Sequence, residues 1–204
     1  MASFFVVEDH TLTNLGIREL LSAQEGFSCA GSALSREEAL AKLTALSERK
    51  SLPDLVLLDL FLGEESGTGL IREVRALFPA VKILMYSMYA KPGIVSLALE
   101  YGADGFVSKA ASESELLEAI ACVMAGSPYV QQSLVAQLVT YRTMFDGLTR
   151  QEQNIFKRIL ERKPNEQIAK ELNIVPRSLE NYLSRIYAKT GCKNHEELLL
   201  RFGS

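Results

Sequence analysis

Five short apolar runs in the first half of the chain constrain its fold more than any other feature. They span residues 4–7, 27–30, 55–58, 81–85 and 105–107. Each run is too short for a helix and is partly β-branched or aromatic, which is typical of buried strands. Segments with helical periodicity separate them, at 10–21, 35–48, 67–78, 91–101 and 112–126. The alternation predicts an α/β fold, a doubly wound five-stranded parallel sheet with helices on both faces.

The composition narrows the class of protein. Of the 204 residues, 48% are hydrophobic and 23% charged, a globular balance that argues against disorder. The best apolar run, 52–62, contains Pro53, Asp54 and Asp59, so no membrane span is expected. The N-terminal stretch lacks a basic region and is acidic by Glu8, unlike a signal peptide. Three scattered cysteines and two isolated histidines predict neither disulfides nor a histidine-centred metal site, and favour a cytoplasmic location.

Polar residues follow several of the predicted strands where each strand ends. Glu8 and Asp9 follow the first strand, Asp59 the third and Lys109 the fifth, and Ser87 ends the fourth. The carboxyl ends of parallel strands meet at one edge of the sheet, where ligands bind in such folds. Any one of these residues alone could simply end a strand. Five of them in this order predict a shared site.

The residue types indicate phosphoryl chemistry. Clustered carboxylates repel one another and need a cation, and oxygen ligands favour Mg²⁺. A carboxylate can also accept a phosphoryl group as a nucleophile. A metal ion, a lysine and a hydroxyl group would stabilise the charge on the transferred group. Asp59, which follows the apolar stretch LVLL, is the expected nucleophile.

The motifs VVEDH, LVLLDL, ILMYS and GADGFVSK, with Gly67 eight residues after Asp59, resemble the receiver domain of bacterial two-component response regulators. The resemblance covers residues 1–125 and implies the flavodoxin-like fold. It implies that a sensor histidine kinase phosphorylates Asp59. One departure is that Leu62-Gly63 stands where the family usually has Met-Pro, which implies a more flexible loop.

The same resemblance assigns the other receiver residues. It implies a Mg²⁺ ion held by Asp9, Asp59 and the backbone carbonyl of Phe61, with Glu8 helping through water. Ser87 and Phe106 match the switch positions, and Lys109 matches the lysine that pairs with the phosphoryl group. In such a switch Ser87 moves toward the phosphoryl group and Phe106 turns inward, although Phe106 could also be an ordinary core residue.

The charge differs between the two ends of the chain. Residues 1–147 carry 11 Lys and Arg against 18 Asp and Glu, whereas residues 148–204 carry 11 against 7. An acidic body with a basic C-terminal part predicts two separate tasks, with nucleic acid as a partner of the basic part. The excess of four positive charges is modest, so charge alone does not decide this.

Three regions are expected: a receiver domain at 1–126, a linker helix at 127–147 and a small all-α domain at 148–204. The linker helix has an apolar face that would pack on either domain or on a second copy of the chain. In the last region Thr149 and Glu152 form a capping-box pattern. Two of its helices are separated by Asn173-Ile174-Val175, which predicts a helix-turn-helix.

The stretches LTRQEQNIFKRIL, NEQIAKELNI, SLENYLSRIYAKTG and HEELL resemble the LuxR-type DNA-binding domain of NarL/FixJ-class response regulators. The resemblance makes the helix that Pro176 opens the recognition helix. The DNA-contacting residues expected there are Arg177, Glu180, Asn181, Ser184, Arg185 and Lys189. Val175, Glu180 and Tyr182 depart from the usual Ser or Thr, Lys and His. Glu180 predicts either an altered base preference or weak DNA binding, since a carboxylate replaces a cation.

The main hypothesis is a response regulator without enzymatic activity of its own. A histidine kinase phosphorylates it with Mg²⁺, and it then binds promoter DNA as a homodimer and controls transcription. A second hypothesis is a phosphorylation-switched module whose helix-turn-helix binds a protein instead of specific DNA. A third is an aspartyl-phosphate phosphohydrolase, but such enzymes usually carry an acid two residues after the nucleophile, where Phe61 stands.

Overall fold

The computed structural model describes residues 2–63 and 65–203. The chain divides into two compact units. The first consists of Met1–Met88 and Ala98–Gln131, and the second of Tyr89–Leu97 and Gln132–Ser204. In the described part of the chain, no helix is both long and apolar enough to cross a membrane.

The first unit is built on a six-stranded parallel sheet in the order β2-β1-β3-β6-β7-β8. Its strands are β1 (Ala2–Val7), β2 (Phe27–Ala33), β3 (Leu55–Leu58), β6 (Lys82–Ser87), β7 (Gly105–Ser108) and β8 (Tyr129–Val130). The doubly wound parallel sheet is confirmed, with one strand more than the five predicted. The sixth, β8, pairs with β7 through two residues, too few to form an apolar run of their own.

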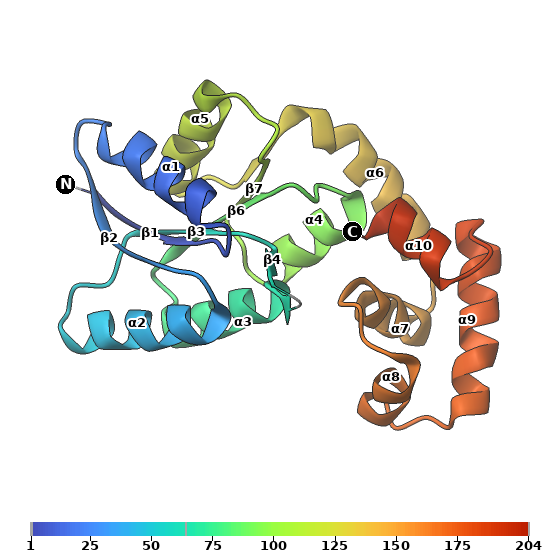
Figure 1. Cartoon of the computed structure of the whole chain (residues 1–204). Helices are drawn as coiled ribbons and strands as arrows, with labels where there is room; N and C mark the ends of the chain where they lie inside the picture. The colour runs from blue at the N-terminus through green and yellow to red at the C-terminus, as the bar shows by residue number, and fades with distance from the viewer. Residues whose placement is uncertain (1, 64, 204) are drawn as a thin grey trace. The chain divides into compact units, whose positions relative to one another are not determined.

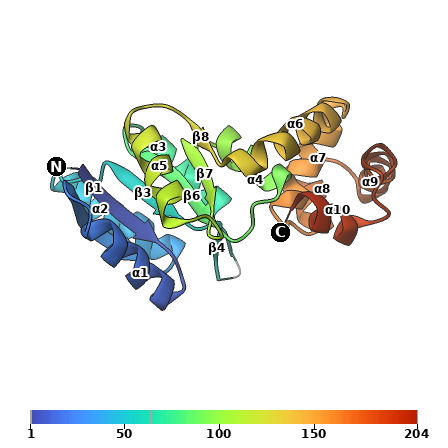
Figure 2. The ribbon, with the colours of Figure 1, turned by 90° about the horizontal axis from the view of Figure 1, so that it is seen from above.

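Four helices cover the two faces of this sheet. As Figures 1 and 2 show, α1 (Thr11–Ser22) and α5 (Glu113–Met124) lie on one face. The helices α2 (Arg36–Glu48) and α3 (Thr68–Leu77) lie on the other face (Figure 1). A further helix, α4 (Pro92–Glu100), has residues in both units.

Strand β1 shows why polar groups collect at the strand ends. Phe4 and Val6 belong to the apolar cluster formed with Ile17 and Leu21 of α1 and with residues of α5. Their neighbours Phe5 and Val7, whose side chains point to the opposite face, are also buried. A strand buried on both faces has room for charged side chains only beyond its ends.

A small antiparallel hairpin, β4 (Phe61–Leu62) with β5 (Glu65–Ser66), follows β3 and was not predicted. Gly63 lies between its strands with φ at +70°, a conformation that favours glycine. Gly67 closes the segment and packs tightly, because a Cβ atom there would lie 2.5 Å from the carbonyl oxygen of Asp59. The glycine eight residues after Asp59 is therefore required by the backbone that surrounds the carboxylate.

The second unit contains α6 (Gln132–Asp146), α7 (Arg150–Leu160), α8 (Asn165–Glu171), α9 (Pro176–Thr190) and α10 (His195–Phe202). The helices α8 and α9 form the predicted helix-turn-helix, with Asn173 in the turn at φ +52°. Pro176 occupies the first turn of α9, and Val175 makes no side-chain cap.

The structure shows which helices the apolar face of α6 packs against. The ring of Tyr141 on α6 lies 6.1 Å from that of Phe156 on α7 and 5.8 Å from that of Phe202 on α10, centroid to centroid. The ring of Phe145, also on α6, lies 5.8 Å from that of Phe156. These are distances at which aromatic rings attract one another. Helix α6 therefore shares its core with the C-terminal helices.

Helix α9 is tied to the start of α7 by one buried carboxylate. Glu152 is 1% exposed and completes a capping box with Thr149, accepting the Thr149 N–H at 2.8 Å. It also pairs with Lys189 Nζ of α9 at 2.7 Å. Burial alone would raise the pKa of Glu152, but the bonds from Lys189 and Thr149 outweigh it and lower that pKa. The pair fixes α9 against α7.

We expect Glu152→Gln to make the helical domain less stable at neutral pH, by about 2 kcal/mol, because a charged acceptor of buried hydrogen bonds is lost. The lowered pKa means that Glu152 contributes stability above its usual pKa of 4.5, which is lost as the pH falls through the lower value in the fold. The variant and wild-type stabilities should therefore converge in acid. Denaturant unfolding followed by circular dichroism between pH 3 and pH 7, with the exposed Glu166→Gln as control, measures this. A stability difference between wild type and Glu152→Gln that stays constant with pH would contradict this role of the Glu152 carboxylate.

Candidate functional site

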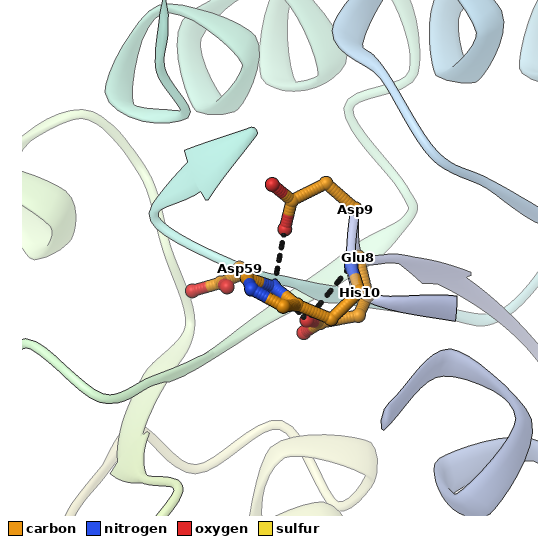
Figure 3. A group of neighbouring side chains, drawn as sticks. All are labelled: Glu8, Asp9, His10 and Asp59. Atoms are coloured by element: carbon orange, nitrogen blue, oxygen red, sulfur yellow. Dashed lines mark hydrogen bonds and ion pairs between the residues drawn. The ribbon is translucent and has the colours of Figure 1, made fainter. Parts of the chain in front are cut away.

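The carboxyl edge of the sheet gathers the charged residues that were predicted to meet. Glu8 and Asp9 follow β1 and Asp59 follows β3, and Lys109 reaches them from the end of β7. Lys109 Nζ lies 2.7 Å from Asp59 Oδ2 and also pairs with Glu8 Oε2. Figure 3 shows the carboxylates of Glu8, Asp9 and Asp59 around the ring of His10.

These groups are largely removed from water. The side chains of Glu8, Asp59 and Lys109 are only 1%, 8% and 9% exposed. Burial raises the pKa of Glu8, and Lys109 opposes this rise. Burial alone would lower the pKa of Lys109, but its bonds to Asp59 and Glu8 outweigh that and raise it. Lys109 is therefore a firmly charged cation between two carboxylates.

The Asp59 carboxylate is held at both oxygens. Oδ1 accepts the N–H of Leu60 at 2.6 Å, and Oδ2 accepts from Lys109 Nζ. A donor on each oxygen fixes the orientation of the carboxylate. A group transferred to Asp59 would arrive directly beside a buried ammonium group, which stabilises added negative charge.

Asp9 differs from Asp59 because its two oxygens have different surroundings. Oδ2 accepts the N–H of Gly63 at 2.9 Å. Oδ1 is buried and accepts no hydrogen bond within the described residues, although His10 Nδ1 lies 2.8 Å away. Ligand atoms of Glu8, Asp9, His10 and Asp59 all lie within 4.8 Å of one another. Three carboxylates this close together, one of them with a buried oxygen that accepts no hydrogen bond from the described residues, fit a hard divalent cation.

His10 was not among the residues expected at this site. Its Nδ1 lies 2.8 Å from Asp9 Oδ1 and 3.2 Å from Glu8 Oε1, and its side chain is 73% exposed. The signal was its position directly after the acidic pair. Phe61 is the first residue of β4, and its carbonyl oxygen as a metal ligand stays a prediction.

The two expected switch residues lie on neighbouring strands. Ser87 ends β6 and is fully buried, and its carbonyl oxygen accepts the N–H of Lys109 at 2.9 Å. Phe106 on β7 is fully buried as well. Its ring is already inside the protein in this structure, so an inward turn is not needed to bury it. The switching role of both residues stays a prediction.

In the helical unit, α9 separates a buried stripe from an exposed one. Leu179, Leu183, Ile186 and Thr190 face inward. The exposed side carries Arg177, Glu180, Asn181, Ser184 and Arg185. The Glu180 carboxylate forms no hydrogen bond or ion pair with the described residues, so it is free to meet a ligand. The guanidinium of Arg185 lies 5.7 Å from the ring centroid of Tyr182.

Lys189 differs from the other residues expected to contact DNA. Its ammonium group binds the buried Glu152 and, at 3.4 Å, the carbonyl oxygen of Gly147. An ammonium group that already has two partners within the protein is less available to a DNA phosphate than an unpaired cation is. A DNA contact by Lys189 stays a prediction, whereas its place in the domain's own structure is observed.

Two family models match separate parts of the chain. The family model described as "Response regulator receiver domain" matches residues 4–121, and the model described as "Bacterial regulatory proteins, luxR family" matches residues 146–202. The transcriptional activator protein ExaE of Pseudomonas putida is 32% identical, over 95% of this chain and 92% of that protein. The activator DevR/DosR of Mycobacterium tuberculosis is 28% identical, over 97% and 92%.

Solved structures show the same fold. RcsB of Salmonella enterica serovar Typhimurium, bound to promoter rprA with the phosphomimetic BeF3⁻, has a TM-score of 0.73 at 22% identity, over 100% of this chain and 98% of that one. A LuxR-family response regulator from Aurantimonas has a TM-score of 0.63 at 27% identity, over 70% and 99%. The site and both domains thus define a signalling protein with a receiver. The chain belongs to the LuxR-type response regulators, the two-component regulators that carry a LuxR-type DNA-binding domain.

We expect Lys109→Met to destabilise the metal-free protein by about 3 kcal/mol, since two buried carboxylates lose their shared cation. A divalent cation should reduce the difference in stability between wild type and Lys109→Met, because it replaces the missing positive charge. Thermal unfolding with EDTA and with the cation measures both effects. Lys42→Met is the control, since Lys42 belongs to an exposed pair with Glu38 and should cost less than about 1 kcal/mol. Equal losses in the two variants would mean that Lys109 does not neutralise the site.

Proposed function

We propose that a sensor histidine kinase phosphorylates Asp59 of this response regulator, and that phosphorylation controls the binding of promoter DNA by α9. The observation that carries the proposal is the buried contact of Lys109 with Asp59, beside the acidic residues Glu8 and Asp9. This arrangement offers a fixed carboxylate nucleophile, a cation for the incoming group and oxygen ligands for a metal ion.

The reaction transfers a phosphoryl group from a phosphohistidine of the kinase to a carboxylate oxygen of Asp59. The bond from phosphorus to the histidine nitrogen breaks as the bond to the Asp59 oxygen forms. Asp9 and Asp59 would hold Mg²⁺, with Glu8 acting through water and the Phe61 carbonyl as a further ligand. When bound, Mg²⁺ supplies positive charge to the phosphoryl oxygens. Lys109 pairs with the same group, and the Ser87 hydroxyl donates to it.

The output side of the proposal rests on the exposed stripe of α9. A recognition helix lies in the major groove and reads base edges with its outward side chains. Arg177 and Arg185 would meet phosphates, and Asn181 and Ser184 offer groups that hydrogen-bond to bases. RcsB, which shares the fold, has been seen as dimers on DNA. We infer that the active form of this chain is likewise a homodimer on paired half-sites, acting in the cytoplasm.

We assign this chain no turnover of an external substrate. Aspartate-based phosphohydrolases usually have a second acid two residues after the nucleophile. Phe61 occupies that position here and offers no group that transfers protons. Asp59 is therefore proposed as a phosphoryl acceptor that stores a signal.

One observation keeps a second candidate function open. The unpaired carboxylate of Glu180 stands where related domains carry a cation, and it repels DNA phosphates. The second candidate is that the helix-turn-helix binds a protein partner and has no specific DNA site. Phosphorylation of Asp59 would then control that contact instead.

Asp59→Asn should abolish phosphoryl incorporation, because the amide is not a nucleophile toward phosphorus. Incubation with a small phosphoryl donor such as acetyl phosphate and Mg²⁺, followed by mass spectrometry of the intact chain, measures it. Asp54→Asn is the matched control, since Asp54 precedes β3 at the opposite end and binds Ser3. Incorporation that persists in Asp59→Asn would rule out Asp59 as the acceptor.

Glu180→Lys should bind DNA more tightly, with a salt dependence steeper by about one unit of log K against log salt, because a new cation meets a phosphate. Electrophoretic shift or anisotropy titrations of duplex DNA at several salt concentrations measure it. The exposed Glu118→Lys on α5 makes the same change of net charge away from α9. Identical DNA binding by wild type, Glu180→Lys and Glu118→Lys would show that α9 does not face DNA. That result would favour the protein-binding candidate.

A further inference from the structure

Gly63 occupies an unusual place beside the acidic cluster. It turns the β4-β5 hairpin at φ +70°, and its N–H donates to Asp9 Oδ2 at 2.9 Å. Receivers of this family usually have proline at this position. Proline has no N–H and holds φ near −65°, so it supports neither the turn nor the hydrogen bond. The bond from Gly63 to Asp9 is therefore a feature that the glycine makes possible.

We propose that Gly63 is a positioning residue for the metal site, because its N–H orients Asp9 as a ligand. This inference rests on the proposed function, since it takes the acidic cluster as the Mg²⁺ site. The bond holds one oxygen of Asp9 toward the hairpin. The other oxygen, Oδ1, points toward the ring of His10, to which a dashed line joins it in Figure 3, inside the cluster formed with Glu8 and Asp59.

The state of Asp9 Oδ1 supports this role. The oxygen is buried and accepts no hydrogen bond within the described residues, a costly state for a carboxylate unless a cation binds there. His10 Nδ1 lies 2.8 Å away on a ring that is 73% exposed, so a cation at Oδ1 would replace a solvent-exposed neighbour. Groups that hydrogen-bond to metal ligands orient them and usually change metal affinity by about 10- to 100-fold when they are removed. A backbone N–H acts in the same way as a side-chain donor.

The arrangement also couples the hairpin to the metal. If the bond between Gly63 and Asp9 favours metal binding, metal binding must strengthen that bond by the same factor. The backbone at Gly63 is thus held more firmly when the site is loaded. A receiver with proline at this position has no donor there and lacks this particular coupling.

The test compares Mg²⁺ binding by wild type, Gly63→Pro and Gly63→Ala, measured by calorimetry on the full chain. Gly63→Pro removes the N–H and should bind Mg²⁺ about tenfold more weakly. Gly63→Ala keeps the N–H at a strained φ, with nothing within 4 Å of the added Cβ, and should lose less. Gly26→Ala is the control for strain, since Gly26 also has a positive φ, +85°, and an open Cβ position away from the site.

A second measurement needs no variant and therefore does not depend on the folding of Gly63→Pro. In wild type, Mg²⁺ should slow hydrogen exchange of the Gly63 amide and shift its NMR signal. Unchanged exchange on saturation, or equal Mg²⁺ affinity of wild type and Gly63→Pro, would overturn the inference. Equal losses of Mg²⁺ affinity in Gly63→Ala and Gly63→Pro would assign the effect to strain in the turn. That result would also overturn the inference. Absence of Mg²⁺ binding in wild type would instead overturn the proposed metal site itself.

Discussion

The ion pairs of Lys109 hold the carboxyl edge of the sheet together. Two strands, β1 and β3, are followed at this edge by acidic residues, and burying their carboxylates without a cation would be prohibitively costly. Lys109 offsets that cost by reaching from β7 to Glu8 and Asp59 at once. The same contact links residues 101 and 50 positions away in the sequence. The site is therefore a consequence of the strand order, since only a parallel sheet delivers all three chain segments to one edge.

Because one lysine neutralises two carboxylates, the site responds to any change of charge at either of them. Lys109 serves two carboxylates in the structure, so any group that adds negative charge at Asp59 competes with Glu8 for the same ammonium. Ser87 is coupled to this competition, because its carbonyl oxygen binds the backbone of Lys109. A local change of charge at Asp59 thus reaches the ends of β6 and β7 through direct contacts. Whether Phe106 moves in response is a separate matter, because its ring is already buried.

The sequence predicted those features that depend on local patterns. The alternating apolar runs predicted the strands, and the capping pair Thr149–Glu152 marked a helix start that the structure confirms. The residues at the strand ends also meet as expected. Features set by tertiary contacts were not foreseen. The strands of the β4-β5 hairpin and β8 are two residues long each, too short to show any periodicity.

The structural role of Lys189 is also set by a tertiary contact that the sequence pattern did not predict. On the sequence it is one more cation of a recognition helix, whereas in the structure it is committed to Glu152. If α9 reads DNA as proposed, the pairing of Lys189 gives Glu180 a larger effect on binding, because fewer unpaired cations on α9 then offset its charge. A carboxylate in the major groove is repelled by phosphates at every sequence, and the repulsion is relieved only where a base amino group, such as cytosine N4, can donate to it. Glu180 would therefore lower affinity for most DNA more than for a matching site, which separates specific from non-specific binding more sharply than a cation would.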